Sequence, residues 1–179
     1  MAIRKKTETI HLRVEPTTKA YLEALGNATG KTSTQVLEGL LEDAAAGFVV
    51  ENVGDYINSA SLKNNRLDLK AALDAAFVDR DIIFTKLRTF YLAKEALSLR
   101  DRYIMSAIID SKDMFLGEDE LFAEDDKVIK PYFVSEAPKL NSQAILRRMS
   151  SLEEYGTFRE KNPNLKSTYR EFLKMTGEE

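Results

Sequence analysis

A chain of 179 residues that is 44% hydrophobic and 31% charged has the composition of a soluble globular protein with one or two domains. It has no cysteine, which excludes disulfides and thiolate zinc sites, and no apolar run approaches the roughly 20 residues needed to span a bilayer. The basic start leads into polar residues and not into the apolar segment of a signal peptide, so we expect a cytoplasmic protein without membrane contact.

The net charge of −3 is unevenly distributed. Residues 1–31 contain six basic and three acidic side chains, a net charge of +3, whereas the other 148 residues contain 20 basic and 26 acidic side chains, a net charge of −6. The basic arm Arg4, Lys5 and Lys6 either neutralises phosphates or merely solubilises the terminus. The acidic total is therefore compatible with nucleic-acid binding through one face.

Residues 9–14 alternate polar and apolar side chains strictly, which predicts a β-strand. The apolar face carries Ile10, Leu12 and Val14, and the polar face carries Thr9, His11 and Arg13. A lone strand leaves its edges unpaired, and the two short helices predicted after it are too small to bury the apolar face. We therefore expect antiparallel pairing with a second copy of the chain.

Two helices are predicted after the strand. Pro16 suits the first position of a helix over 16–28, because the N–H that proline lacks has no acceptor there. Gly30 suits a left-handed helix terminus, and Thr32 with Gln35 has the spacing of a capping box at the start of the second helix. The expected dimer core combines the apolar residues of strand and helices: Ile10, Leu12, Val14, Leu22, Leu25, Val36, Leu37, Leu40 and Leu41.

The strand–helix–helix order of residues 7–45 resembles the ribbon–helix–helix DNA-binding proteins, typified by the Arc and MetJ repressors. The resemblance implies that the outward strand residues Thr9, His11 and Arg13 contact bases in the major groove. It also implies that the start of the second helix holds a DNA phosphate. Together with basic side chains of the arm and turn, the expected phosphate contacts are Lys5, Lys6, Lys31, Thr32, Ser33 and Thr34.

The chain departs from Arc at two places. The proline lies one residue later, and the positions of Arc's buried charge triad hold Lys31, Val36 and Leu40, two of which are apolar. Chemically, Arg13 suits a bidentate bond to guanine, whereas Thr9 and His11 suit base edges or phosphates. The alternative is that all three residues form only the solvated face of a strand.

The segment 26–32, GNATGKT, is similar to a phosphate-binding Walker loop but has three residues between its glycines where that loop needs four. It also follows a predicted helix and not a strand. A turn between two helices explains the segment, so nucleotide hydrolysis is not expected.

The remaining residues predict a mostly helical second domain, which makes the whole chain mainly α, with a ribbon–helix–helix domain over 1–49 and a helical domain over 50–179. Helices are expected over 67–78, 80–98 (capped by Asp79), 99–111, 142–155 and 165–175, and an extended piece interrupted at Pro131 over 128–134. The acidic segment 117–126 lacks the spacing of a calcium loop and is expected to be a solvated loop or face.

The second domain shows no catalytic constellation, metal motif or cofactor motif, and resembles no family. We therefore expect no enzymatic activity, and assign it to oligomerisation, partner binding or effector sensing. The leading hypothesis is a sequence-specific homodimeric repressor that binds double-stranded DNA. The alternatives are an antitoxin that represses its operon and masks a toxin, and an accessory DNA-binding protein of plasmid transfer or segregation.

Overall fold

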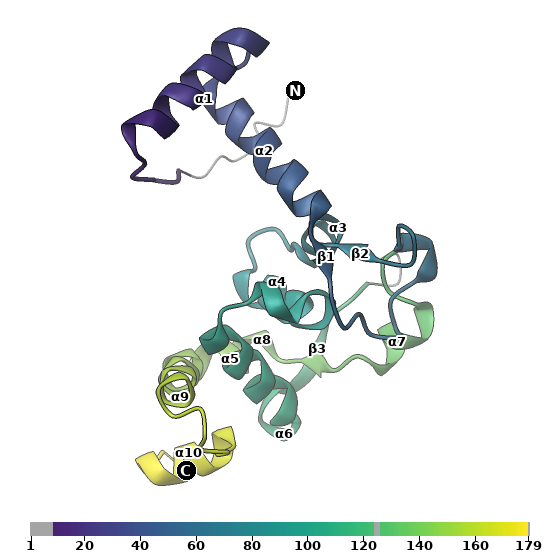
Figure 1. Ribbon diagram of the computed structural model, residues 1–179. Helices are drawn as coiled ribbons and strands as arrows, with labels where there is room; N and C mark the ends of the chain where they lie inside the picture. Colours follow the sequence, from purple (N-terminus) through teal and green to yellow (C-terminus); the bar gives the residue numbers. More distant parts are fainter. Residues whose placement is uncertain (1–8, 124–125, 179) are drawn as a thin grey trace, which may run out of the picture. The chain divides into compact units, whose positions relative to one another are not determined.

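The computed structural model describes residues 9–123 and 126–178 and shows a mainly helical protein (Figure 1). The chain forms two compact units, residues 1–44 (the N-terminal unit) and 45–179 (the C-terminal unit). The boundary falls within the second helix, five residues before the boundary expected at 49/50. Lys5 and Lys6 of the basic arm lie outside the described residues.

The N-terminal unit contains α1 (Pro16–Thr29) and most of α2 (Ser33–Gly47). Helix α1 matches the predicted range of 16–28 to within one residue, and α2 begins directly after its predicted cap, Thr32. Pro16 occupies the first turn of α1, and Gly30 ends it with φ 67° and ψ 22°, in the left-handed region. The capping box is present: the Thr32 N–H donates to Gln35 Oε1 over 3.0 Å, and the Gln35 N–H donates to Thr32 Oγ1 over 3.2 Å.

The strand predicted over 9–14 is not formed in the single chain. The described residues 9–15 have no regular secondary structure and lead irregularly into α1 (Figure 1). A strand needs a neighbour to accept and donate its backbone hydrogen bonds, and no other described segment pairs with these residues.

The C-terminal unit is built from short helices and two small antiparallel sheets, in which β1 pairs with β2 and β3 pairs with β4. Its elements in chain order are β1 (Val49–Val50), the 3₁₀ turn Ser59–Ser61, β2 (Leu67–Asp68), α3 (Leu69–Ala76), α4 (Ile82–Leu92), the 3₁₀ turn Lys94–Ala96, α5 (Leu99–Asp110), α6 (Lys112–Phe115), β3 (Leu116–Glu120), α7 (Pro131–Glu136), β4 (Lys139–Leu140), α8 (Ser142–Arg147), α9 (Met149–Lys161) and α10 (Tyr169–Thr176).

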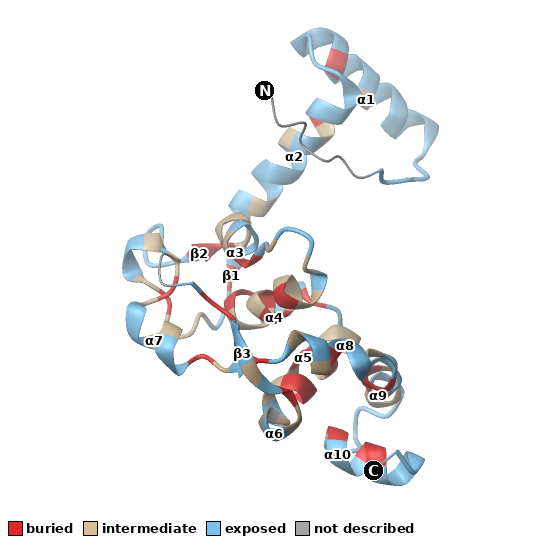
Figure 2. Ribbon diagram, turned by 180° about the vertical axis from the view of Figure 1, so that it is seen from behind, coloured by how far each residue is buried: buried red, intermediate tan, exposed pale blue. Residues whose placement is uncertain are grey.

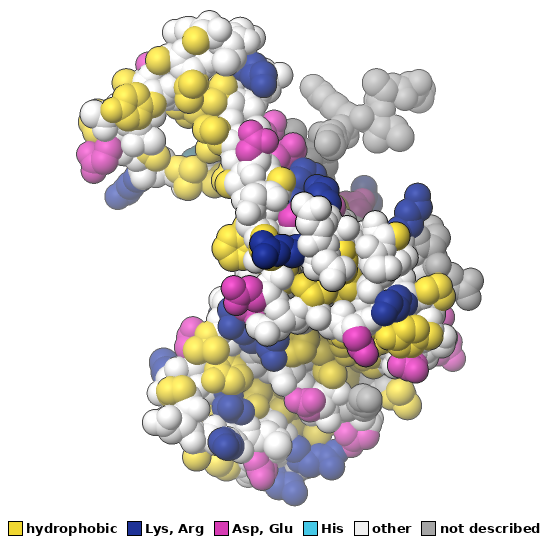
Figure 3. Space-filling view, turned by 45° about the vertical axis from the view of Figure 1, so that its right-hand side comes forward, with side chains coloured by type: hydrophobic (Ala, Val, Ile, Leu, Met, Phe, Trp, Pro, Cys, Tyr) yellow, Lys and Arg dark blue, Asp and Glu magenta, His cyan; other side chains and the backbone are white. Residues whose placement is uncertain are grey.

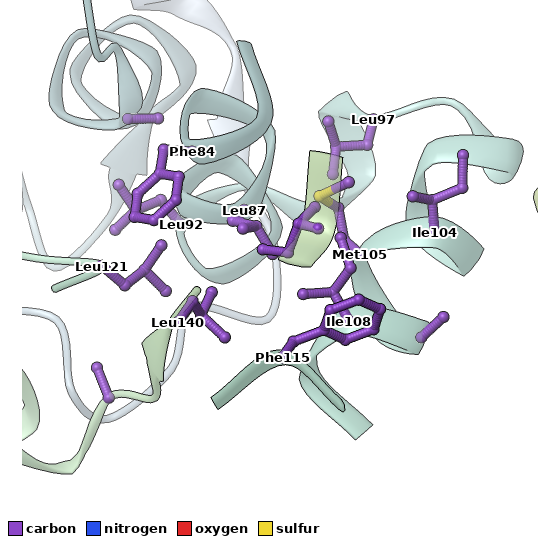
Figure 4. Packing of buried hydrophobic residues seen from close by; sticks show 14 of the residues in the cluster. Phe84, Leu87, Leu92, Leu97, Ile104, Met105, Ile108, Phe115, Leu121 and Leu140 are labelled. Atoms are coloured by element: carbon purple, nitrogen blue, oxygen red, sulfur yellow. The ribbon is translucent and has the colours of Figure 1, made fainter. Parts of the chain in front are cut away.

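The C-terminal unit has its own hydrophobic core (Figure 4). Helices α3 and α4 pack together, and so do α5 and α9. The core side chains include Leu87 of α4, Ile108 of α5, Phe115 of α6, Leu121 directly after β3 and Leu140 of β4. This unit therefore buries enough apolar surface to hold its fold within one chain.

Several predicted elements of the C-terminal unit were wrong in detail. Asp81 and not Asp79 caps α4, because its carboxylate accepts the Phe84 N–H over 2.9 Å. Pro131 does not interrupt an extended piece but begins α7, where its missing N–H is harmless. The helix expected over 142–155 is divided at Arg148 into α8 and α9, and the acidic segment contributes β3.

Candidate nucleic-acid interface

The three residues expected to contact bases, Thr9, His11 and Arg13, are all exposed in the irregular segment before α1. Their apolar neighbours are exposed as well: Ile10 by 72%, Leu12 by 63% and Val14 by 54%. The single chain therefore does not separate the segment into a buried face and a solvent face. The alternation of polar and apolar residues over 9–14 therefore produces a buried face and an exposed face only if another chain covers one side of the segment.

The start of α2 is an exposed group of hydrogen-bond donors. The first N–H groups of a helix have no acceptor within the helix. The Thr32 hydroxyl accepts the Gln35 N–H, which leaves the N–H groups of Ser33 and Thr34 as the remaining donors of this turn. Lys31, immediately before them, is exposed and makes no ion pair with the described residues. This end of the helix is suited to bind an anion, as expected for residues 31–34.

The turn between α1 and α2 depends on a close approach of the backbone at Gly26. The Lys31 N–H donates to the Gly26 carbonyl over 3.0 Å, which folds the chain back on the end of α1. A Cβ on Gly26 would lie 2.9 Å from the Lys31 carbonyl oxygen, so only glycine fits without displacement of the backbone. The segment that is similar to a Walker loop is thus a helix–turn–helix junction.

Of the expected dimer core, the described chain buries little. Val36 is buried, with 8% of its surface exposed, and Leu22 and Leu37 are half-buried. The other helix residues of the set are exposed: Leu25 by 44%, Leu40 by 52% and Leu41 by 57%. Figures 2 and 3 show the consequence, an N-terminal unit that is exposed over most of α1 and α2 and carries hydrophobic side chains on its surface.

Tyr21 is a further exposed apolar residue that the expected dimer core did not include. It is exposed by 69% and lies on α1 with Leu22 and Leu25. Its spacing from Leu25 is one helical turn, which is the signal that places both side chains on the same side of the helix. Charge on α1 is balanced locally, since Lys19 pairs with Glu23 at 3.7 Å.

No protein-family model matches the chain, and neither a curated protein nor a solved structure matches it significantly. Among the described residues, no helix is long and apolar enough to cross a membrane. The same residues contain no group of three or more histidine or acidic side chains placed to hold a metal ion.

Proposed function

We propose that the chain is a homodimeric DNA-binding protein that acts as a sequence-specific transcriptional repressor. In the dimer, residues 9–14 of two copies pair as an antiparallel ribbon. Thr9, His11 and Arg13 then face the major groove of double-stranded DNA, and the start of α2 contacts a phosphate.

The observation that carries the proposal is the exposed apolar surface of the N-terminal unit. Seven large apolar residues from its three segments are exposed by 44–72%: Ile10, Leu12, Val14, Tyr21, Leu25, Leu40 and Leu41. Monomeric proteins rarely leave such residues together in water. Burial of one large apolar side chain stabilises by about 1.5–3 kcal/mol, so a second copy that covers this surface provides a core that one copy lacks.

The anion-binding geometry of α2 supports DNA as the ligand of that dimer. A ribbon alone contacts bases, but protein–DNA complexes are positioned mainly by phosphate contacts. The exposed Lys31 and the free first turn of α2 supply such contacts twice in a two-fold dimer.

The experiment that tests the proposal is selection of bound sequences from random duplex DNA by the full-length protein. We expect a short enriched site with two-fold symmetry, because a symmetric dimer reads a symmetric site. Arg13→Ala should lose the preference at one base pair in each half-site, with a loss of about 1–3 kcal/mol for each contact. Arg147→Ala is the matched control, because Arg147 is exposed on α8 in the other unit.

Enrichment of no sequence would overturn the proposal, and so would an Arg13→Ala variant with unchanged affinity and site preference. The antitoxin alternative has its own signature, a toxic protein that copurifies stably with the chain. The C-terminal unit supports the repressor, since it has a packed core within one chain, whereas antitoxin tails of the resembling family tend to be short and disordered until bound.

A further inference from the structure

A tight basic hairpin, residues 63–66, directly precedes β2 in the C-terminal unit (Figure 1). The Lys63 N–H donates to the Arg66 carbonyl over 2.9 Å, and the Arg66 N–H donates to the Lys63 carbonyl over 3.0 Å. The two residues between them, Asn64 and Asn65, have φ of 50° and 64°, which is typical of a type I′ turn. Asparagine tolerates this left-handed backbone better than most residues, so both positions suit the turn.

The basic hairpin places two positive charges side by side. Residues that exchange both backbone hydrogen bonds in an antiparallel pair lie directly opposite each other, with their side chains on one face. Asp68 follows Arg66 by two residues and shares that face, and the ion pair of 2.9 Å between Lys63 Nζ and Asp68 Oδ2 agrees with this placement. Like charges directly opposite each other destabilise a β pair. The opposition of Lys63 and Arg66 therefore costs free energy, which a bound anion on this face offsets.

A hollow of about 350 Å³ lies beside this face of the basic hairpin. Its lining belongs to the C-terminal unit alone and consists of Ala46, Val49, Lys63, Asn64, Arg66 and Asp68. Asp68 is the only acidic side chain of the lining. It is matched by Lys63, and its Oδ1 also accepts the Ala71 N–H over 2.7 Å at the start of α3. The charge of Arg66 thus remains uncompensated in the hollow.

The side chains of Arg66 and Asn64 are available to a ligand. Both residues are exposed, and neither side chain makes a hydrogen bond or an ion pair with the described residues. Arg66 uses its backbone N–H and carbonyl within the hairpin, so the guanidinium is left for other contacts. A guanidinium binds a phosphate through two parallel hydrogen bonds, and the Asn64 amide is a further donor beside it.

Lys127 extends the positive charge beyond the basic hairpin. Its carbonyl oxygen accepts hydrogen bonds from Ser61 Oγ over 3.0 Å and from Asn58 Nδ2 over 3.1 Å, which holds it beside the segment that leads into the hairpin. Lys127 is exposed and makes no ion pair with a described residue. The neighbouring acid, Asp126, does not neutralise it, because Asp126 pairs with Arg88 at 2.6 Å.

The hollow suits a phosphate of a polymer better than a free small molecule. Small-molecule sites bury most of the ligand against largely apolar walls, whereas four of the six residues that line this hollow are polar or charged. Contacts to DNA phosphates come from arginine, lysine and asparagine side chains, among others. The dense charge of a DNA backbone supplies a counterion to each exposed cation of this surface.

We propose that the basic hairpin is a second DNA-contacting element of the chain. Arg66 and Asn64 bind the phosphate backbone, with Lys127 beside them. The inference rests on the proposed DNA-binding function and adds to it a contact of the C-terminal unit. This contact contributes affinity but no base preference, because phosphates carry no sequence information.

The test is the salt dependence of duplex DNA binding by the full-length Arg66→Gln variant, measured by fluorescence anisotropy. A dimer loses two phosphate contacts, so the affinity for every duplex should fall about tenfold, and the slope of log affinity against log salt should become less steep by about 2. The wild-type slope should be steeper by the same amount than the contacts of the N-terminal unit alone produce. Asn64→Asp keeps a residue that suits a positive φ but adds a negative charge to the hollow, and it should weaken binding as well.

The matched controls are Arg147→Gln and Lys161→Gln. They remove exposed charges on α8 and at the end of α9 that do not line the hollow, so both should keep the wild-type affinity and slope. Arg13→Ala should change which sequence is bound, whereas Arg66→Gln should change how tightly every sequence is bound. The two contacts can therefore fail separately.

Equal affinity and equal slope of the wild type and Arg66→Gln would overturn the inference and leave the proposed function standing. An equal loss in the two controls would overturn it too, because the loss would then follow total charge and not the hairpin. A wild type that binds no duplex overturns both. Saturable calorimetric binding of inorganic phosphate that Arg66→Gln loses, with unchanged DNA binding, would assign the hollow to a small phosphorylated ligand instead. Thermal unfolding of each variant establishes that weaker binding does not reflect a loss of fold.

Discussion

At the scale of single residues, Gly26 decides whether α1 and α2 meet at the observed turn. A Cβ at this position would lie 2.9 Å from a backbone oxygen, and backbone cannot move aside as the tip of a side chain can. We predict that Gly26→Ala destabilises the N-terminal unit by about 1–2 kcal/mol, measured by chemical denaturation.

Gly39→Ala is the matched control for Gly26→Ala. Gly39 lies inside α2, and a Cβ there would meet nothing within 4 Å. The same glycine-to-alanine change should therefore stabilise by about 0.5–1 kcal/mol through helix propensity. Equal effects of the two substitutions would contradict the close approach at Gly26.

Asp68 links the stability of the C-terminal unit to pH. Its Oδ1 accepts the Ala71 N–H over 2.7 Å at the start of α3, and its Oδ2 lies 2.9 Å from Lys63 Nζ. The backbone hydrogen bond first, and the lysine second, lower the pKa of Asp68 below its ordinary value of 3.8. The stabilisation of the C-terminal unit by ionised Asp68 is therefore present at pH values above the ordinary pKa. It is lost as the pH falls through the lowered pKa of the folded state.

We predict that Asp68→Ala costs about 1 kcal/mol at pH 7, the usual value of a lost helix cap. Asp68→Asn should cost less, because its amide oxygen still accepts the Ala71 N–H. Denaturation at pH 7 and pH 3 should show a smaller loss on acidification in both variants than in the wild type. An unchanged pH dependence in Asp68→Ala would contradict this role.

At the scale of elements, sequence patterns correctly predicted the helix starts and ends that depend only on neighbouring residues. Pro16, Gly30 and the Thr32–Gln35 pair act within one turn of their own backbone, and the structure places all of them as predicted. The starts of α4 and α7 were wrong because each region offers several local solutions. Asp79 and Asp81 are both acceptable caps, and Pro131 suits both an extended piece and a first helical turn.

Local sequence patterns did not predict the elements that depend on partners distant in the sequence. Strand β3 pairs with β4, so that Glu120 lies opposite Lys139. This pairing brings an acidic segment, whose sequence indicates a loop, against a strand that is distant in the chain. The contact between the end of α9 and the start of α10 was missed for the same reason, since Arg159 and Ser167 meet only when these helices fold together. The spacing of residues in the sequence does not predict this contact, in which Arg159 Nη1 donates to the Ser167 carbonyl oxygen.

The segment 9–14 is the element whose predicted form requires a second chain. Leu12→Glu places a carboxylate on the face that the paired ribbon buries, and an unpaired buried charge costs several kcal/mol. We predict that it weakens dimerisation at least about a hundredfold, measured by analytical ultracentrifugation. His11→Glu adds the same carboxylate one residue away on the outward face, and should keep the dimer while losing DNA. A Leu12→Glu variant that remains dimeric would contradict ribbon pairing.

At the scale of the whole molecule, the negative net charge conceals a basic N-terminal region, which is the DNA-binding face in the proposed function. An overall charge of −3 coexists with a net charge of +3 over residues 1–31. If Lys5, Lys6 and Lys31 of both copies contact phosphates, the logarithm of DNA affinity should fall with the logarithm of salt concentration with a slope of about −5. Lys31→Gln should reduce this slope by about 2, because each dimer loses two contacts, whereas Lys161→Gln should leave it unchanged. A slope near zero in the wild type would argue against nucleic acid as the ligand.

The division into two units predicts how the molecule unfolds. The C-terminal unit has its core within one chain, whereas the described part of the N-terminal unit buries only Gly26 and Val36 in its two helices. If a second copy completes the N-terminal core, its stability follows mass action and that of the C-terminal unit does not. A hundredfold increase in protein concentration should therefore add about 2.7 kcal/mol to one unfolding equilibrium and raise its Tm by several degrees.

Scanning calorimetry over that concentration range should show two transitions, of which only one moves. Leu12→Glu should abolish the moving transition and leave the other in place, which assigns each transition to its unit. A single transition with a Tm independent of concentration would mean that the exposed residues of α1 and α2 are covered by some means other than a second copy. In the proposed dimer an intermolecular surface stabilises the N-terminal unit, and the dependence of its Tm on protein concentration tests that proposal.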